Sequence, residues 1–176
     1  MLVTERLVLR PFTREDSKNC FENWGADPLT GTYFPYLPVG SFSEMKIIIN
    51  QYSENENILA VVEKRTGNII GSVSIDIPYE ELKIGELAYF LGSAWWGQGY
   101  AKEAVQEFLH YLFVDRGMYL IEAKYNETNC RSGTLLKRLG FRYDGTLRGR
   151  RIDKDTGERK GLVVCSILKE EFFHSM

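Results

Sequence analysis

Two glycines stand directly in front of a helical pattern in the segment "AWWGQGYAKEAVQEF", residues 94–108. Gly97 and Gly99 allow the backbone to approach a ligand closely. The helix that follows exposes up to four unpaired N–H groups at its partially positive N-terminal end. Such a turn can therefore bind a phosphate or a pyrophosphate. A plain tight turn leading into a helix would show the same pattern.

Three kinds of nucleotide site use a turn of this type. A P-loop requires G-x-x-x-x-G-K-[ST], and the chain has no such run. A dinucleotide fingerprint requires a third glycine where Lys102 stands, and a βαβ unit where the preceding segments look like hairpins. The third is a coenzyme A site, in which the turn holds the pyrophosphate and the neighbouring strand offers backbone groups to the pantetheine arm.

The periodicity of the chain places this turn in a single α+β domain spanning residues 1–176. Thr13 with Asp16 and Ser41 with Glu44 are N-cap patterns, and a long loop with three prolines occupies residues 26–40. Alternating or short apolar runs predict strands at residues 6–12, 58–64, 68–77, 84–92, 119–125, 145–152 and 162–168. Helices are predicted at residues 14–23, 44–52, 100–117 and 129–140.

Composition narrows the class of protein. The net charge of −2 and the pI near 5.8 argue against a nucleic-acid-binding protein. No apolar run is long enough for a membrane span, and no secretory signal is visible, so we expect no membrane partner. The three cysteines and two histidines are too scattered for a metal site, and reduced thiols fit a cytoplasmic protein.

The segment "WWGQGYAKEA" resembles the acetyl-CoA-binding motif of the GNAT N-acetyltransferase superfamily, (Gln/Arg)-x-x-Gly-x-(Gly/Ala). Gly99 and Ala101 match its last two defined positions, and Trp96 stands where Gln or Arg is usual. The form "WGxGYAxEA" is similar to the branch of the ribosomal-protein N-terminal acetyltransferases RimJ and RimL. "TERLVLRPFTREDS", "NCRSGTLLKRLGF" and "VCSILKEEF" resemble the opening, the later helix and the closing strand of that branch, so the resemblance covers nearly the whole chain.

The resemblance implies a GNAT-like domain with a mixed, mostly antiparallel sheet that splays at the cofactor site and is flanked by helices. Acetyl-CoA would be the cosubstrate, without a metal. Its implied contacts are backbone groups of Phe90 and Leu91 to pantetheine, amide hydrogens of Gly97, Gln98, Gly99, Tyr100 and Ala101 to the pyrophosphate, the charge of Lys102 near the phosphates, and Asn129 to the pantetheine chain. Lys102 pointing to solvent and Asn129 serving only as a helix cap are the alternatives.

The implied reaction transfers an acetyl group from a thioester to a primary amine, which must lose a proton. We expect Glu86 as the base, since burial on an otherwise apolar strand face would raise its pKa. The alternative is an edge glutamate paired with a cation, and Glu122 is the second candidate base. Many family members place a tyrosine acid where Leu136 stands, so Ser132 is expected to stabilise the departing thiolate unless it is a surface serine. A backbone N–H near Leu91 would polarise the thioester.

The acceptor is harder to derive. A protein N-terminal α-amine follows from the resemblance, and a polyamine, an amino acid or an aminoglycoside is the alternative within the same class. The loop at residues 30–40 would shape the acceptor pocket as a lid, with Tyr33, Phe34 and Tyr36 as its wall, or would simply pack down. A non-catalytic acyl-CoA-binding module and a carbohydrate-binding module are the rival classes. Edge strands would allow a homodimer.

Overall fold

The computed structural model describes residues 1–34, 37–153 and 156–174. The α+β class is confirmed: helices flank a mixed sheet whose described strands follow the order β1-β2-β3-β4-β5-β6-β8-β7. The chain forms two compact units, Met1–Ser74 with Tyr89–Tyr111, and Ile75–Ala88 with Leu112–Met176. Strands β4 (Ile69–Tyr79) and β5 (Ile84–Leu91) each contribute to both units.

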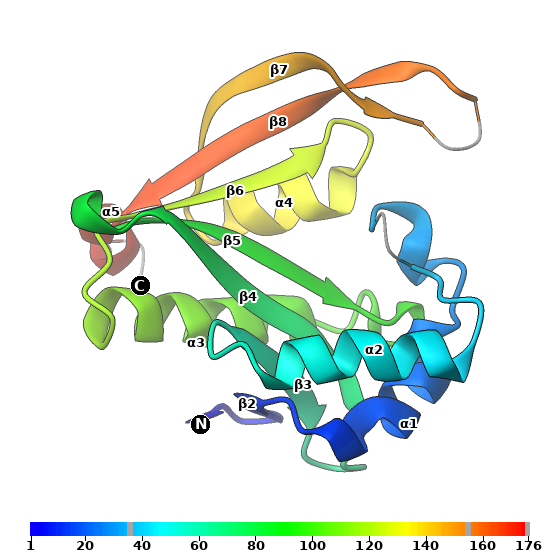
Figure 1. Ribbon diagram of the computed structural model, residues 1–176. Coiled ribbons are helices and arrows are strands. Elements are labelled where there is room, and N and C mark those ends of the chain that lie inside the picture. The colour runs from blue at the N-terminus through cyan, green and yellow to red at the C-terminus, as the bar shows by residue number, and fades with distance from the viewer. Residues whose placement is uncertain (35–36, 154–155, 175–176) are drawn as a thin grey trace. The chain divides into compact units, whose positions relative to one another are not determined.

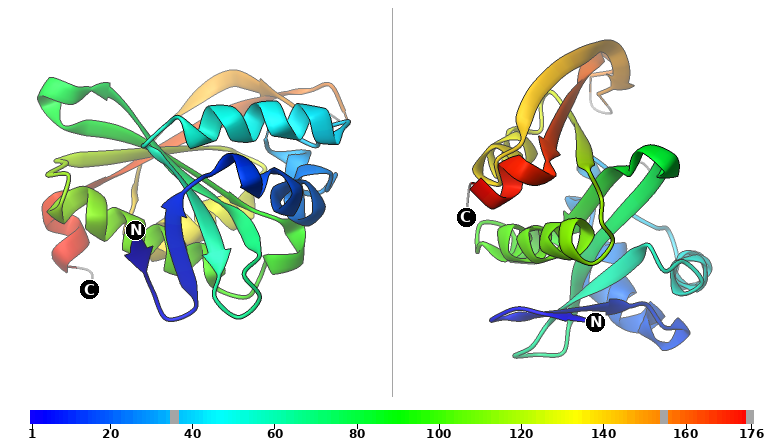
Figure 2. Two further views of the ribbon diagram at one scale, coloured as in Figure 1. Left: turned by 60° about the horizontal axis from the view of Figure 1, so that its bottom comes forward. Right: turned by 90° about the vertical axis from the view of Figure 1, so that its left-hand side faces the viewer.

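The first unit begins with an antiparallel hairpin of β1 (Leu2–Val3) and β2 (Leu7–Pro11), and β2 pairs with β3 (Ile58–Glu63) (Figure 2, left). In β2 the side chains of Leu7 and Leu9 are fully buried, as the period-2 pattern predicts. Strand β3 pairs in turn with the first part of β4, from Ile58 opposite Ser74 to Val62 opposite Ile69.

The helical segments of the first unit start at the predicted caps. The carboxylate of Asp16 accepts a hydrogen bond from the Thr13 N–H at 2.8 Å, and the Ser41 hydroxyl accepts one from the Glu44 N–H at 3.3 Å. The first helix was predicted as a regular helix to Asn23. It is instead a 3₁₀ turn, η1 (Arg14–Asp16), α1 (Ser17–Cys20) and a π-helical turn, η2 (Phe21–Gly25).

Helix α2 (Phe42–Ser53) lies beside α1 (Figure 1). Together with η2 and the loop that follows it, these helices cover one hydrophobic core of the first unit. Its buried members are Phe12, Cys20, Trp24, Leu37, Val39, Met45, Ile49, Ala60 and Ile69.

The second unit contains the parallel pair of the sheet. Strand β5 pairs with β6 (Leu120–Asn126) from Ile84 opposite Leu120 to Leu87 opposite Ala123. Strand β8 (Arg159–Leu168) pairs antiparallel with β6 and with β7 (Arg142–Ile152), and β7 and β8 form a long hairpin (Figure 1). Both hairpin strands begin three residues earlier than predicted, because the polar residues at the start of each strand continue the backbone ladder without an apolar signal.

Two helices complete the second unit, α4 (Cys130–Arg138) and α5 (Lys169–His174). The last strand ends at Leu168, as predicted, but the helical turn α5 that follows it was not predicted. The Glu171 carboxylate accepts a hydrogen bond from the Leu168 N–H at 3.0 Å, and the buried Phe172 ring packs 5.3 Å from that of Phe113. These contacts favour a final helical turn over a continued strand.

Helix α3 (Tyr100–Val114) is the long amphipathic helix predicted after the glycine turn. Its apolar stripe is buried, comprising Ala104, Val105, Phe108, Leu109, Leu112 and Phe113. His110 is exposed, as expected for the polar face of the helix. In the part of the chain that the structure describes, no helix has the length and apolar character needed to cross a membrane.

Candidate active site

The glycine turn has the backbone conformation that its sequence predicts. After β5, a 3₁₀ turn (Ser93–Trp95) leads to Gly97 with φ 75° and Gly99 with φ 84°, both in the left-handed region that favours glycine. The Trp96 indole Nε1 donates a hydrogen bond to the Leu91 carbonyl at 2.8 Å. Trp96 therefore ties the turn to the end of β5, the role expected for a residue packing the base of the turn.

Helix α3 starts with amide groups that have no acceptor inside the helix. Its first backbone hydrogen bond runs from the Glu103 N–H to the Gly99 carbonyl at 3.1 Å, so the amides of Tyr100, Ala101 and Lys102 precede the helical ladder. Gly97, Gln98 and Gly99 are exposed, and so is the Lys102 side chain. The Gly97–Lys102 turn thus presents exposed glycine backbone and the positive end of a helix. Its backbone N–H groups form a set of donors that fits a pyrophosphate.

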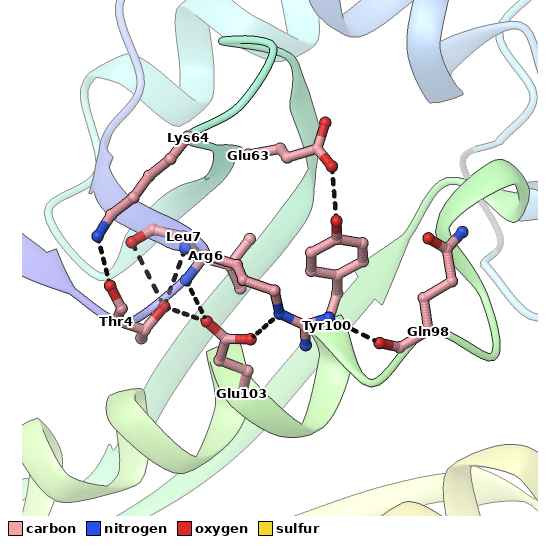
Figure 3. A network of polar contacts seen from close by, with 8 residues as sticks. All are labelled: Thr4, Arg6, Leu7, Glu63, Lys64, Gln98, Tyr100 and Glu103. Atoms are coloured by element: carbon pink, nitrogen blue, oxygen red, sulfur yellow. Dashed lines mark hydrogen bonds and ion pairs between the residues drawn. The ribbon is translucent and has the colours of Figure 1, made fainter.

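A network of polar contacts lies behind this turn (Figure 3). Arg6 Nε pairs with Glu103 at 2.6 Å and Arg6 Nη1 donates to the Gln98 carbonyl at 3.0 Å. The Arg6 guanidinium carbon also stands 4.3 Å from the centroid of the Tyr100 ring. The Tyr100 hydroxyl donates to the buried Glu63 carboxylate at 2.6 Å. The turn is therefore held from β3 and from the β1–β2 hairpin.

The same network shifts the titration of its members. The hydrogen bond to Glu63 raises the pKa of Tyr100, and hydroxyl groups of Thr66 and Tyr100 lower the pKa of Glu63. Burial favours a raised pKa for Glu103, but hydrogen bonds from Thr4 and Arg6 hold that pKa below its usual value. Glu63 and Glu103 are therefore charged and Tyr100 is neutral at physiological pH.

Aromatic rings surround Phe90, one of the predicted pantetheine contacts. The Phe90 ring centroid is 4.8 Å from that of Trp24 and 4.8 Å from that of Phe34. Phe34 packs against the core of the first unit, whereas Tyr33 is 45% exposed. Tyr36, the third predicted wall residue, lies outside the described residues. Phe34, one of the three predicted wall residues, therefore anchors the loop by packing against the Phe90 ring.

Asp27 ties this loop to the start of the glycine turn. Its carboxylate accepts hydrogen bonds from the Ser93 N–H at 3.1 Å, the Leu29 N–H at 2.9 Å and the Thr30 hydroxyl at 2.7 Å. Burial would raise the pKa of Asp27, but these hydrogen bonds lower it to about 2. The charged form of Asp27 thus fixes the loop against the chain that follows β5.

In the second unit, Glu86 is paired with a cation. Lys124 Nζ lies 2.5 Å from the Glu86 carboxylate and 4.0 Å from that of Glu122, which is opposite Glu86 in the parallel register. The Glu86 side chain is 35% exposed. The expected burial among apolar neighbours is thus only partial, because Glu86 shares the more open face of β5 while Leu87 takes the buried one. Its role as base stays a prediction.

Asn129 caps α4, as predicted. Its side-chain oxygen accepts a hydrogen bond from the Ser132 N–H at 3.2 Å, and Ser132 is half-buried. Leu136, at the position of the family tyrosine, is a core residue with 2% exposure. The Tyr125 hydroxyl lies against Gly133, where an added Cβ would come within 2.8 Å of its oxygen. Tyr125 was not among the predicted site residues.

The predicted site residues fall into two groups. Phe90, Leu91 and the Gly97–Lys102 turn belong to the first unit, and the second contains Glu86, Glu122, Asn129 and Ser132. Sequence reasoning missed Arg6, which is 92 residues from Gln98 and lies in the turn between β1 and β2 rather than at the start of the predicted strand. It also missed Lys124. The alternative interpretation of Glu86, an edge glutamate paired with a cation, could have directed attention to a lysine on the neighbouring strand. Among the described residues, no group of three or more His, Cys, Asp or Glu is placed to hold a metal ion.

Comparison with known proteins gives a consistent family. A family profile described as an acetyltransferase (GNAT) domain matches residues 6–142. An uncharacterized N-acetyltransferase, p20, of Bacillus licheniformis is 33% identical over 176 residues, covering 97% of each chain. The [ribosomal protein uS5]-alanine N-acetyltransferase of Escherichia coli is 39% identical over 59 residues, covering 34% of this chain and 30% of the relative.

Among solved structures, spermidine N-acetyltransferase from Vibrio cholerae, in complex with CoA and spermine, aligns with a TM-score of 0.81. Its sequence is 19% identical, and the alignment covers 97% of this chain and 99% of that one. At this identity the likeness establishes the fold alone. The family profile and the full-length relative establish more: the chain belongs to the GNAT family of acetyltransferases and is an N-acetyltransferase.

Proposed function

We propose that the protein transfers the acetyl group of acetyl-CoA to the N-terminal α-amine of a protein, and that residues 1–176 form one N-acetyltransferase domain. The observation that carries the first half of the proposal is the Gly97–Lys102 turn, with its two left-handed glycines and its unpaired helix amides. Backbone N–H donors at the positive end of a helix suit the negative charge of a pyrophosphate. The family profile, which includes parts of both units, supports the single domain.

Acetyl-CoA supplies the acetyl group as a thioester. The amides of the Gly97–Lys102 turn hold the pyrophosphate, and backbone groups of Phe90 and Leu91 hold the pantetheine arm. The Leu91 carbonyl already accepts the Trp96 indole N–H, so the remaining lone pair of this oxygen is the one available to pantetheine. Asn129 adds a contact to pantetheine beyond its cap, and Ser132 donates a hydrogen bond to the departing thiolate.

Glu86 removes the proton of the acceptor amine, directly or through a water molecule. A carboxylate beside a protonated amine is an electrostatic match, and Glu86 and Glu122 lie opposite each other on neighbouring strands. In the structure, Lys124 Nζ pairs with both carboxylates, and the ammonium group of an acceptor would pair with them in the same way. We therefore assign proton removal to Glu86 first and to Glu122 second.

The α-amine of a protein is preferred as acceptor because the ribosomal-protein alanine N-acetyltransferase of Escherichia coli is 39% identical over 59 residues, whereas the spermidine enzyme is 19% identical. A polyamine is the second candidate. It is favoured by the two carboxylates in register, which suit an acceptor with more than one positive charge, and by the fold similarity to the spermidine enzyme.

An acceptor panel separates these candidates. The purified protein is incubated with acetyl-CoA and, in parallel, with peptides that begin with Ala or Ser, with spermidine and with an aminoglycoside, and products are identified by mass spectrometry. We expect a mass increase of one acetyl group, placed on the α-amine of a peptide. Acetylation of spermidine alone would overturn the α-amine assignment. Binding of acetyl-CoA without any acetylated product would favour the non-catalytic acyl-CoA-binding module.

A further inference from the structure

The guanidinium group of Arg6 lies between Glu103 and the Gln98 carbonyl of the Gly97–Lys102 turn (Figure 3). We infer that Arg6 is a positioning residue for this turn: it orients the Gln98–Gly99 peptide group so that the Gly99 N–H faces the pyrophosphate. The inference rests on the proposed function, since it specifies how the turn acquires the orientation that binding requires. It adds a residue that lies outside the glycine motif.

The orientation follows from the geometry of the peptide bond. Arg6 Nη1 donates to the Gln98 carbonyl at 3.0 Å, and in a trans peptide group the C=O and the N–H point in opposite directions. Fixing the carbonyl toward the guanidinium therefore turns the Gly99 N–H away from it. Gly99 lies close to Arg6, since a Cβ at this position would be 3.4 Å from Arg6 Nη2, and its φ of 84° is the feature that favours glycine there.

Arg6 is itself held on several sides. Its Nε pairs with Glu103 at 2.6 Å, its backbone N–H donates to the same carboxylate at 2.7 Å, and its guanidinium packs over the Tyr100 ring. The planar fork of an arginine can bind two acceptors at fixed angles, which a lysine ammonium cannot do. The position of the Gln98 carbonyl is thereby tied to a rigid group.

Two features of the turn explain why such a residue is needed. Trp96 stands where Gln or Arg is usual in the family motif, and its indole N–H is used on the Leu91 carbonyl. Glu103 adds a negative charge in the first turn of α3, where it would repel a pyrophosphate. Arg6 neutralises Glu103 and holds the Gln98 carbonyl with the same guanidinium group.

The substitution Arg6→Lys tests this assignment. Lysine keeps the positive charge beside Glu103 but cannot also orient the Gln98 carbonyl. We expect the Kd of acetyl-CoA to rise about tenfold, the size of a lost well-aligned polar contact. At saturating acetyl-CoA, kcat should stay within about twofold of wild type, because no reacting atom is touched. Arg14→Lys is the matched control: Arg14 pairs with Glu54 at 3.1 Å with both side chains 68% exposed, and the Kd should not change.

A truncated donor distinguishes positioning from a general structural role. S-acetyl-pantetheine lacks the pyrophosphate, so wild type and Arg6→Lys should use it with equal kcat/KM. An equal Kd of acetyl-CoA in the two proteins, or a similar loss with S-acetyl-pantetheine, would overturn the inference. If wild type itself does not bind acetyl-CoA, the proposed function fails and the inference fails with it, which is a distinguishable result.

A double variant covers the case in which Arg6→Lys folds poorly. In R6M/E103Q both charges are removed together, and the amide oxygen introduced at position 103 can still accept from the Thr4 hydroxyl and the backbone N–H of residue 6. The same selective loss of acetyl-CoA binding is expected, with S-acetyl-pantetheine unaffected. A wild-type Kd for acetyl-CoA in a folded R6M/E103Q protein would contradict the inference.

Discussion

At the scale of single residues, the ion pair of Glu86 with Lys124 bears directly on the proposed role of Glu86 as base. Their atoms are 2.5 Å apart, and Glu122 lies 4.0 Å from the same ammonium group. An approaching protonated amine carries the same charge as Lys124 Nζ and competes with it for the carboxylate. In the proposed reaction, the acceptor amine would therefore have to take the place of Lys124 Nζ beside Glu86.

The substitution Glu86→Gln should lower kcat at pH 7 by about 100-fold, the low end for loss of a general base. The thermal shift caused by acetyl-CoA should remain, since Glu86 is not a predicted cofactor contact. The deficit should shrink between pH 7 and pH 9, because an α-amine with a pKa of about 8 then loses its proton to solvent.

Initial rates by mass spectrometry across this pH range measure the effect. Glu81→Gln is the control, since Glu81 is an exposed glutamate of the turn before β5. A kcat of wild-type size at pH 7 would eliminate Glu86 and direct the same experiment to Glu122. A deficit that is constant with pH would indicate that Glu86 binds the acceptor without accepting its proton.

At the scale of elements, Asp27 connects the loop after η2 to the residues that follow β5. The folded pKa of about 2 lies below the unfolded value of about 3.9. A depressed pKa means that Asp27 contributes stability above the unfolded pKa and loses this contribution as the pH falls through the folded pKa. The contribution is therefore full at pH 6 and declines from about pH 4 toward pH 2.

We expect Asp27→Asn to lower the free energy of unfolding by about 1 kcal/mol at pH 6, since an amide replaces a charged acceptor of three hydrogen bonds. The difference from wild type should shrink as the pH is lowered from 4 to 2. Urea unfolding at a series of pH values tests this, with the exposed Asp76→Asn as control. A difference that does not depend on pH would contradict a role for the carboxylate charge.

Local patterns predicted most elements because local physics decides them. The Ser41 and Asn129 caps, the buried stripe of α3 and the apolar strands β3 and β4 all depend on neighbours within a few residues. The final helix α5 was missed, because it is only six residues long and depends on the packing of Phe172 against Phe113, which lies 59 positions earlier in the sequence. The burial of Glu86 was also overestimated. Its neighbours in the sequence are apolar, but Glu86 lies on the more open face of β5.

The candidate site was predictable to the same degree. The glycine turn and its helix follow from residues 97–101 alone, and the left-handed glycines agree with that prediction. Arg6 and Lys124 could not be found in this way, because their partners come from other strands and helices. An arginine in an alternating strand predicts only a solvent-facing side chain until the position of Gln98 is known.

At the scale of the whole molecule, the residues proposed to contact acetyl-CoA come from distant parts of the sequence. The Gly97–Lys102 turn belongs to the first unit, and Asn129 and Ser132 belong to the second. A pyrophosphate alone needs only the turn, whereas pantetheine is expected to extend to the start of α4. Ligands of different length should therefore protect different parts of the chain.

Hydrogen–deuterium exchange followed by mass spectrometry measures this difference. Acetyl-CoA should slow exchange in peptides that cover residues 97–103 and residues 129–135, and inorganic pyrophosphate should slow exchange in the first set only. Core strand β3, at Ile58–Glu63, serves as the internal reference, since it contains no predicted ligand contact. If acetyl-CoA protects only the turn, then Asn129 is a helix cap alone and Ser132 does not reach the donor. Thiolate stabilisation would then have to be sought elsewhere, first at the Tyr125 hydroxyl beside Gly133.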